Sequence, residues 1–144
     1  QDGTEVGNNF YWLSTKPDIL DYEAETGAWQ FYTPSKKYAD FKLLRQLPPI
    51  ELDVQCSYRT QGDITTATVG LTNGSSQIAF FNELALCGTK SGDTILPVFW
   101  EDNYFSLTPN ETRTIKATFA VGDLGDDKPQ MHLNGWNATA KENG

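Results

Sequence analysis

Apolar and polar residues alternate along most of this chain, and this period of two limits the fold more than any other feature. The clearest run, residues 50–58, places five residues on one face: Ile50, Leu52, Val54, Cys56 and Tyr58. A second run places Ile115, Ala117, Phe119 and Val121 together, with Thr114, Lys116 and Thr118 on the other side. Successive side chains of a β-strand point to opposite faces of a sheet, so the pattern is that of half-buried strands. We therefore predict an all-β sandwich.

Turn residues divide the alternating runs into separate strands. Gly, Asn, Asp and Pro gather at residues 61–63, 73–76, 90–93 and 109–111, where they supply the backbone conformations that tight turns need. We predict strands at 9–14, 29–32, 50–58, 65–72, 78–87, 95–99, 104–107, 112–121 and 130–137. In the run 78–87 the apolar face is expected to hold Ile78, Phe80, Leu84 and Leu86, with Cys87 and Glu83 on the other face.

One segment has helical rather than strand spacing. Phe41, Leu44 and Leu47 recur every three residues within 38–47, which predicts a short helix that ends before Pro48-Pro49. We expect residues 1–47 to be an N-terminal arm that packs on the sandwich, and residues 48–144 to be the sandwich itself, as one structural domain overall. The chain starts at Gln1 and its single Met is Met131, so we expect a piece of a larger protein.

Charge and composition exclude several classes of partner. The chain has 11 Lys and Arg against 19 Asp and Glu, a formal net charge of -8, which repels the phosphates of nucleic acids and of anionic membranes. No apolar run is long enough to span a bilayer. We therefore expect neither nucleic acid nor membrane as a partner.

The two cysteines allow two interpretations. Alternation directs Cys56 toward the core and Cys87 to the opposite face of its strand, so a disulfide would need a bulge or a shared edge. Two free or buried thiols are the simpler interpretation, and the chain has no second His or Cys-x-x-Cys pair for a metal site.

The residue types that catalysis requires are sparse. Nucleophilic catalysis by a Ser-His or Cys-His pair needs an imidazole, and the only one is His132, in a predicted strand. Acidic residues gather in three loops (Asp18/Asp21/Glu23/Glu25, Glu101/Asp102 and Asp123/Asp126/Asp127), where solubility and turn formation explain them. Calcium is the best functional alternative for 123–127, although the spacing is not that of an EF-hand. We predict no catalytic residue, no metal and no cofactor.

Three Asn-x-Ser/Thr sequences begin at Asn73, Asn110 and Asn137, each in or beside a predicted turn. They are possible glycan acceptors in a eukaryotic secretory pathway. Turn formation alone is the simpler explanation.

Aromatic residues supply the remaining candidates for a binding surface. Residues 98–105 carry four aromatic side chains around an acidic turn, more than one core face accommodates. Three explanations stay open: packing of alternate members in the core, an interface with another domain, and a platform for sugars. The arm aromatics, Trp12 among them, also need a covering surface.

Three separated motifs resemble one known domain type. They are Asn9-Phe10-Tyr11-Trp12-Leu13-Ser14 with Lys16-Pro17-Asp18, then 97–107 with Pro109 and Glu111, then Asn134-Gly135-Trp136-Asn137. In this order they are similar to the C-terminal immunoglobulin-like domain of glycoside hydrolase family 2 enzymes, in the branch of exo-β-D-glucosaminidase and β-mannosidase (mannosylglycoprotein endo-β-mannosidase). The segment from Tyr38 to Leu44 before Pro48-Pro49 fits as well. The chain differs at Glu101, where the family often has Ser, and at Asn110, where it often has Gly.

The resemblance implies an immunoglobulin-like antiparallel β-sandwich that is a non-catalytic accessory domain of a multidomain retaining β-glycosidase, of the β-mannosidase or the exo-β-D-glucosaminidase type. Such a domain would stabilise the enzyme and flank its substrate cleft, its partners would be the enzyme's other domains, and the enzyme would be secreted or periplasmic. A carbohydrate-binding module, with oligosaccharide as its partner, is the alternative on the same fold. The candidate interface or sugar-stacking residues are Trp100, Asn103, Tyr104, Trp136 and Trp12.

Overall fold

The chain divides into two compact units, Gln1–Leu47 and Pro48–Gly144. The structure is a computed structural model that describes residues 9–27, 29 and 31–141. No helix among these residues is both long enough and apolar enough to cross a lipid bilayer.

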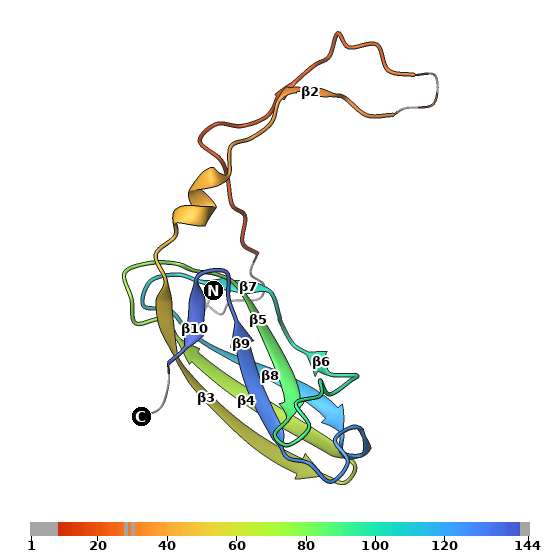
Figure 1. Cartoon of the computed structure of the whole chain (residues 1–144), viewed down its shortest axis with the longest axis vertical. Coiled ribbons are helices and arrows are strands. Elements are labelled where there is room, and N and C mark those ends of the chain that lie inside the picture. The colour runs from red at the N-terminus through yellow and green to blue at the C-terminus, as the bar shows by residue number, and fades with distance from the viewer. Residues whose placement is uncertain (1–8, 28, 30, 142–144) are drawn as a thin grey trace, which may run out of the picture. The chain divides into compact units, whose positions relative to one another are not determined.

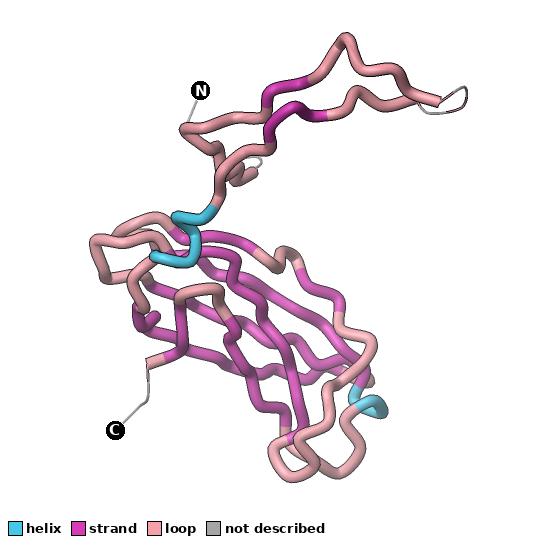
Figure 2. Tube along the Cα trace, turned by 45° about the horizontal axis from the view of Figure 1, so that its top comes forward, coloured by secondary structure: helices cyan, strands magenta, loops and turns pink. Residues whose placement is uncertain are grey.

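The first unit contains little regular structure. Strand β1 (Ile19–Leu20) pairs antiparallel with β2 (Ser35–Lys37), and a 3-10 helix, η1 (Lys42–Gln46), follows. The helix is the upper cyan segment of Figure 2. It lies within the predicted segment 38–47, and the Asp40 carboxylate accepts the Lys42 N–H at its first residue. As predicted, η1 ends before Pro48-Pro49.

Two predicted strands of the arm are wrong. Residues 9–14 form no strand, and neither do Trp29, Phe31 and Tyr32; Gln30 lies outside the described residues. Alternation shows which side chains share a face, but a strand also needs a neighbouring strand for its backbone N–H and C=O groups. Here β1 and β2 supply the only described pairing of this unit, and neither is in the alternating runs.

The second unit is a sandwich of two sheets (Figure 1). Within the described residues, one sheet has the strand order β10-β3-β4-β8-β6 and the other has the order β7-β5-β9. The strands are β3 (Ile50–Gln61), β4 (Ile64–Thr72), β5 (Ala79–Gly88), β6 (Phe99–Trp100), β7 (Phe105–Leu107), β8 (Thr112–Ala120), β9 (Pro129–Asn134) and β10 (Ala138–Ala140), with a 3-10 turn, η2 (Val121–Asp123), after β8. Their pairings are antiparallel except for β10, which runs parallel to β3.

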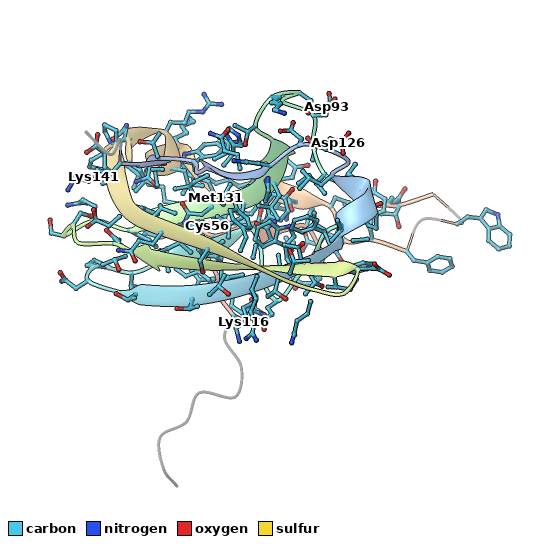
Figure 3. All side chains as sticks on the ribbon, turned by 90° about the horizontal axis from the view of Figure 1, so that it is seen from below. Cys56, Asp93, Lys116, Asp126, Met131 and Lys141 are labelled. Atoms are coloured by element: carbon cyan, nitrogen blue, oxygen red, sulfur yellow. The ribbon has the colours of Figure 1, made fainter. Side chains whose placement is uncertain are left out.

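The core lies between the sheets and follows the predicted alternation. Its fully buried side chains include Leu71 of β4, Leu84 of β5 and Phe119 of β8. Burying a side chain of this size contributes roughly 1.5–3 kcal/mol. Cys56 and Met131, from opposite sheets, both pack against the core, and Figure 3 shows them between the layers while Lys116 points outward. Cys56 and Cys87 are free thiols, as the simpler interpretation predicted.

Strand β5 changes phase at Phe81, which corrects the predicted apolar face. Ala79 and Asn82 are buried together with Leu84 and Leu86, whereas Ile78 and Phe80 are only partly buried. The register between β5 and β7 shifts between Ala79 and Asn82, and Phe81 has a φ of 52°. Such a bulge turns every later side chain to the other face relative to a regular strand.

The final predicted strand is interrupted at Gly135. β9 ends at Asn134 in one sheet, and β10 begins at Ala138 in the other. A Cβ atom on Gly135 would lie 2.6 Å from Asn82 Oδ1 and 2.7 Å from the Ala138 carbonyl oxygen, so only glycine fits where the chain changes sheets.

Two other boundaries also differ from the prediction. Residues 95–99 are not a strand: Ile95 is a buried loop residue, a cis Leu96-Pro97 bond follows it, and pairing begins only at Phe99. Val121, expected on the core face, is 38% exposed because β8 ends at Ala120.

Candidate functional site

A cavity of about 320 Å³ collects aromatic side chains from three separate segments of the sandwich. We call it the aromatic cavity. Its lining residues are Phe81 and Glu83 of β5, Tyr104 from the segment between β6 and β7, Asn134 of β9, and Gly135 and Trp136 from the turn between β9 and β10. The rings stay accessible, with Phe81 49%, Tyr104 54% and Trp136 56% exposed. These features make it the strongest candidate for a ligand site.

Two of the rings stand on backbone that bulky residues rarely adopt. Phe81 has a φ of 52° and Tyr104 a φ of 57°. Outside glycine this left-handed conformation costs roughly 1–2 kcal/mol per residue. It brings the two rings to a centroid distance of 5.5 Å with 39° between their planes.

Buried and half-buried amides hold this backbone in place. The Asn103 side chain accepts the N–H groups of Leu84 and Tyr104 through Oδ1 and donates to the Leu84 carbonyl oxygen through Nδ2. The fully buried Asn82 donates through Nδ2 to the carbonyl oxygens of Ala79 and Phe105, which ties the bulge of β5 to β7. The Phe81 N–H is bonded to Ser106 Oγ at 3.3 Å. Both strained positions are therefore fixed by the fold.

Glu83 is the only charged residue among the described residues that line the cavity. Its carboxylate accepts the Tyr104 hydroxyl at 2.9 Å through Oε1 and the Asn134 amide at 3.3 Å through Oε2. The hydrogen bond to Glu83, together with its negative charge, raises the pKa of Tyr104, because both favour the neutral phenol. The cavity thus combines ring faces with one fixed negative charge.

Trp136 is positioned by the same turn that moves the chain between sheets. Its backbone N–H donates to the Phe80 carbonyl oxygen at 3.0 Å, and its ring meets the Phe80 ring edge to face at 6.4 Å. The next residue, Asn137, accepts the Phe80 N–H and donates to the carbonyl oxygens of Ile78 and Pro48. The Asn-Gly-Trp-Asn motif is therefore both a structural junction and the support of an exposed ring.

The structure separates the five residues that the sequence singled out. Tyr104 and Trp136 line the aromatic cavity, and Asn103 supports Tyr104 from behind. Trp100 is partly buried against the core in β6, and Trp12 belongs to the first unit, where it is partly buried.

Sequence reasoning missed Phe81, Glu83 and Asn134. A signal for Phe81 was present, since two adjacent aromatic residues in one strand, Phe80 and Phe81, cannot both face the same core.

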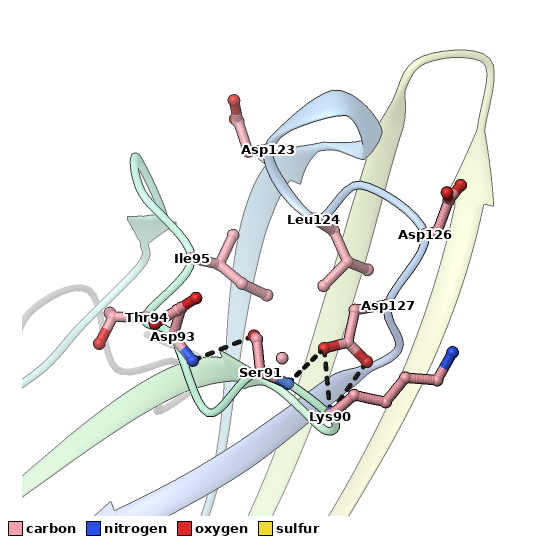
Figure 4. A pocket seen from close by; sticks show the side chains of 10 residues that line it. Lys90, Ser91, Asp93, Thr94, Ile95, Asp123, Leu124, Asp126 and Asp127 are labelled. Atoms are coloured by element: carbon pink, nitrogen blue, oxygen red, sulfur yellow. Dashed lines mark hydrogen bonds between the residues drawn. The ribbon is translucent and has the colours of Figure 1, made fainter.

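A larger cavity, of about 490 Å³, lies among the acidic loops, where calcium was the functional alternative (Figure 4). Asp127 joins these loops: its carboxylate accepts the backbone N–H groups of Lys90, Ser91 and Lys128. The Ser91 N–H has the largest effect in lowering the Asp127 pKa. Figure 4 shows Asp123 and Asp126 pointing away from Asp127, and no group of three potential metal ligands occurs in the described part of the chain. The Asp127 carboxylate therefore stabilises these loops.

The possible glycan acceptors differ in accessibility. Asn73 is fully buried, and its Nδ2 donates to the carbonyl oxygens of Gln77, Leu107 and Thr108. Asn110 is exposed at a φ of 61° in a turn, which fits the turn interpretation. The nitrogen that would carry a glycan at Asn73 is thus enclosed by the fold.

Comparison with known proteins identifies the domain. Residues 30–138 match the family model described as the exo-β-D-glucosaminidase Ig-fold domain. The chain belongs to this family. An exo-β-D-glucosaminidase of Streptomyces avermitilis is 39% identical to this Ig-fold domain over 138 residues, and the match covers 94% of the chain and 15% of the relative.

Two further similarities agree with this assignment. The crystal structure of the exo-chitosanase CsxA of Amycolatopsis orientalis superposes on the Ig-fold domain with a TM-score of 0.84 at 36% identity, covering 95% of this chain and 16% of that one. A mannosylglycoprotein endo-β-mannosidase of Lilium longiflorum is 33% identical over 91 residues, covering 58% of the chain and 9% of the relative. The predicted glycoside hydrolase resemblance and the immunoglobulin-like sandwich are both confirmed.

Proposed function

We propose that this chain is a non-catalytic accessory domain of an exo-β-D-glucosaminidase, where it stabilises the enzyme and flanks the cleft for β-linked glucosamine. The observation that carries the proposal is the extent of the match: 94% of the chain aligns with 15% of a glucosaminidase. A self-contained Ig fold that spans so small a share of its relatives is a domain within a larger architecture.

The ionisable groups of the described residues support a non-catalytic role. Glycoside hydrolysis uses two carboxyl groups on either side of the bond, one of them an acid with a raised pKa. Three carboxyl groups of this chain, those of Asp40, Glu111 and Asp127, accept backbone N–H groups that lower their pKa values, which fits structural roles. His132 is exposed on β9.

The first unit supports a role in contact with other parts of an enzyme. None of its described residues is buried, and Trp29 and Phe31 are 88% and 93% exposed. Apolar surface of this kind marks an interaction site in soluble proteins. In the proposed enzyme, these two rings pack against a neighbouring domain.

An antibody raised against this chain tests the architecture in an extract of the source organism. We expect a polypeptide several-fold heavier than the chain, with glucosaminidase activity in the immunoprecipitate. A band at the mass of the chain alone would contradict the proposal.

Variants of the full-length enzyme test the stabilising role. Phe31→Ser is expected to lower the melting temperature of the enzyme, whereas the matched change Lys37→Ser in β2 leaves it unchanged. The isolated chain with Phe31→Ser should melt like the unmodified chain, because Phe31 is almost fully exposed there. Equal melting of all three enzymes would overturn this part of the proposal.

A further inference from the structure

We infer that the aromatic cavity binds one protonated amino-sugar unit of a β-linked glucosamine chain. The identity of the sugar rests on the proposed function. The position of the site rests on the lining, the charge and the fixed backbone of the cavity.

The first argument is the shape and lining of the cavity. About 320 Å³ lined by three exposed rings and a few convergent polar groups is typical of a small-molecule site, whose usual range is ~300–1,000 Å³. A β-linked glucosamine ring carries its substituents around its edge and axial C–H groups on its faces. Those faces stack on aromatic rings, and the Tyr104 hydroxyl, Glu83 and Asn134 are available to the hydroxyl groups at the edge.

The second argument is charge. Glu83 is held beside the rings by Tyr104 and Asn134 and meets no Lys or Arg among the described lining residues. A carboxylate accepts up to about four hydrogen bonds, so Glu83 keeps capacity for an ammonium group. Aromatic faces also attract cations. With a net charge of -8 the chain as a whole favours a polycation such as chitosan.

The third argument is preorganisation. Phe81 and Tyr104 both keep a left-handed backbone, and the amides of Asn82 and Asn103 fix the segments that carry them. Strained residues that the surroundings hold in place are characteristic of ligand sites. Rings fixed before binding lose little conformational freedom when a ligand arrives.

The test is a titration of the 144-residue chain with fully deacetylated glucosamine tetramer at acidic pH, followed by calorimetry and tryptophan fluorescence. The acetylated tetramer serves as the uncharged probe of the same length. We expect saturable binding of the glucosamine tetramer and about tenfold weaker binding of the acetylated one, because a hydrogen bond to a charged group is lost. Absence of saturable glucosamine binding at millimolar concentration would overturn the inference.

Two variants assign the binding to the cavity. Trp136→Ala should abolish binding of the glucosamine tetramer. Glu83→Gln should weaken binding of the glucosamine tetramer about tenfold and leave binding of the acetylated tetramer unchanged. The matched controls are Trp29→Ala, another exposed tryptophan, and Glu51→Gln, another exposed glutamate, and neither should change the affinity. Thermal melting of each variant establishes that it is folded. Loss of binding in a control, or its retention in folded Trp136→Ala, would place the sugar elsewhere and overturn the inference.

The outcome is independent of the antibody experiment. Saturable binding together with a band at the mass of the chain alone would remove the proposed enzyme and leave an amino-sugar-binding protein. No binding together with a heavy band would leave the accessory domain and overturn the amino-sugar site, with the cavity then assigned to contact with another domain.

Discussion

The side-chain amide of Asn103 pairs with the backbone of Leu84 in both directions. Its Nδ2 donates to the Leu84 carbonyl oxygen at 3.0 Å, and its Oδ1 accepts the Leu84 N–H at 2.8 Å. A side chain thus takes the place of a neighbouring strand along this part of β5. The same Oδ1 accepts the Tyr104 N–H, so the arrangement joins the core of β5 to the aromatic cavity.

Asn103→Ala removes these bonds and leaves the Leu84 backbone groups without partners. We expect a loss of about 1–3 kcal/mol in the free energy of unfolding, measured by urea denaturation. Thr114→Ala, on the exposed face of β8, is the control and should change stability by less than about 0.5 kcal/mol. Equal urea-denaturation midpoints for Asn103→Ala and Thr114→Ala would mean that the Asn103 amide does not stabilise β5.

Gly135→Ala tests the tight passage between the sheets. The added Cβ would meet Asn82 Oδ1, the Ala138 carbonyl oxygen and the Ala138 Cβ, all within 3 Å. Overpacking of this kind costs about 1–3 kcal/mol, and thermal unfolding should report it. Gly74→Ala is the matched control, since its Cβ would meet nothing within 4 Å. If Gly135→Ala were as stable as Gly74→Ala, the turn would be able to accommodate the added methyl group at little cost in free energy.

The left-handed backbone of Tyr104 predicts an unusual order of stability. Tyr104→Ala and Tyr104→Gly lose the same ring, but only alanine retains the conformational strain at a φ of 57°. Tyr104→Gly should therefore be the more stable of the two, by about 1 kcal/mol. At Tyr58, within β3, the order should reverse, because glycine weakens an extended strand. Chemical denaturation of the four variants compares them directly, and the same order at both positions would refute the assignment.

Glu111 gives the sandwich a dependence on acid. Partial burial raises its pKa, but this is outweighed by hydrogen bonds from the Thr108 N–H and hydroxyl and by Arg113, so the pKa is lowered from 4.5. A carboxyl group with a lower pKa in the folded state contributes stability above its unfolded pKa and loses it as the pH falls through the folded value.

The free energy of unfolding should therefore fall below about pH 4.5 partly through Glu111. Glu111→Gln should be less stable at neutral pH and show a shallower decline in acid. Urea denaturation at a series of pH values gives the free energy of unfolding of both proteins as a function of pH. Parallel curves would mean that Glu111 does not contribute to the loss of stability in acid.

Much of the sandwich was predictable because its central strands keep a strict alternation. Every second residue is buried in β4 from Thr65 onward and in β8 from Ile115 onward, so pattern and structure coincide there. The phase of β5 was not predictable, because it depends on Asn82, whose amide bonds to Phe105, a residue 23 positions away. The pattern at 9–14 predicted a strand, but these residues form none, because a sequence pattern does not show whether a partner strand lies alongside.

The candidate site was predictable only in part. Tyr104 and Trp136 stood out as aromatic residues beside turn sequences, but nothing local connects them to Phe81 or Glu83. Their proximity depends on the bulge in β5 and on the passage of the chain between sheets after Asn134. Asn103 was a candidate contact residue, and the structure places it as the support of Tyr104.

The enclosed amide of Asn73 has a consequence for how the protein is made. Oligosaccharide transfer in the endoplasmic reticulum acts on nascent chains, at a stage when Asn73-Gly-Ser75 is still accessible. A sugar attached there would replace one of the two Nδ2 hydrogens that three carbonyl oxygens share in the folded protein. Production in the bacterial cytoplasm lets the fold close over Asn73 unmodified, whereas secretion from yeast sets glycan transfer in competition with folding.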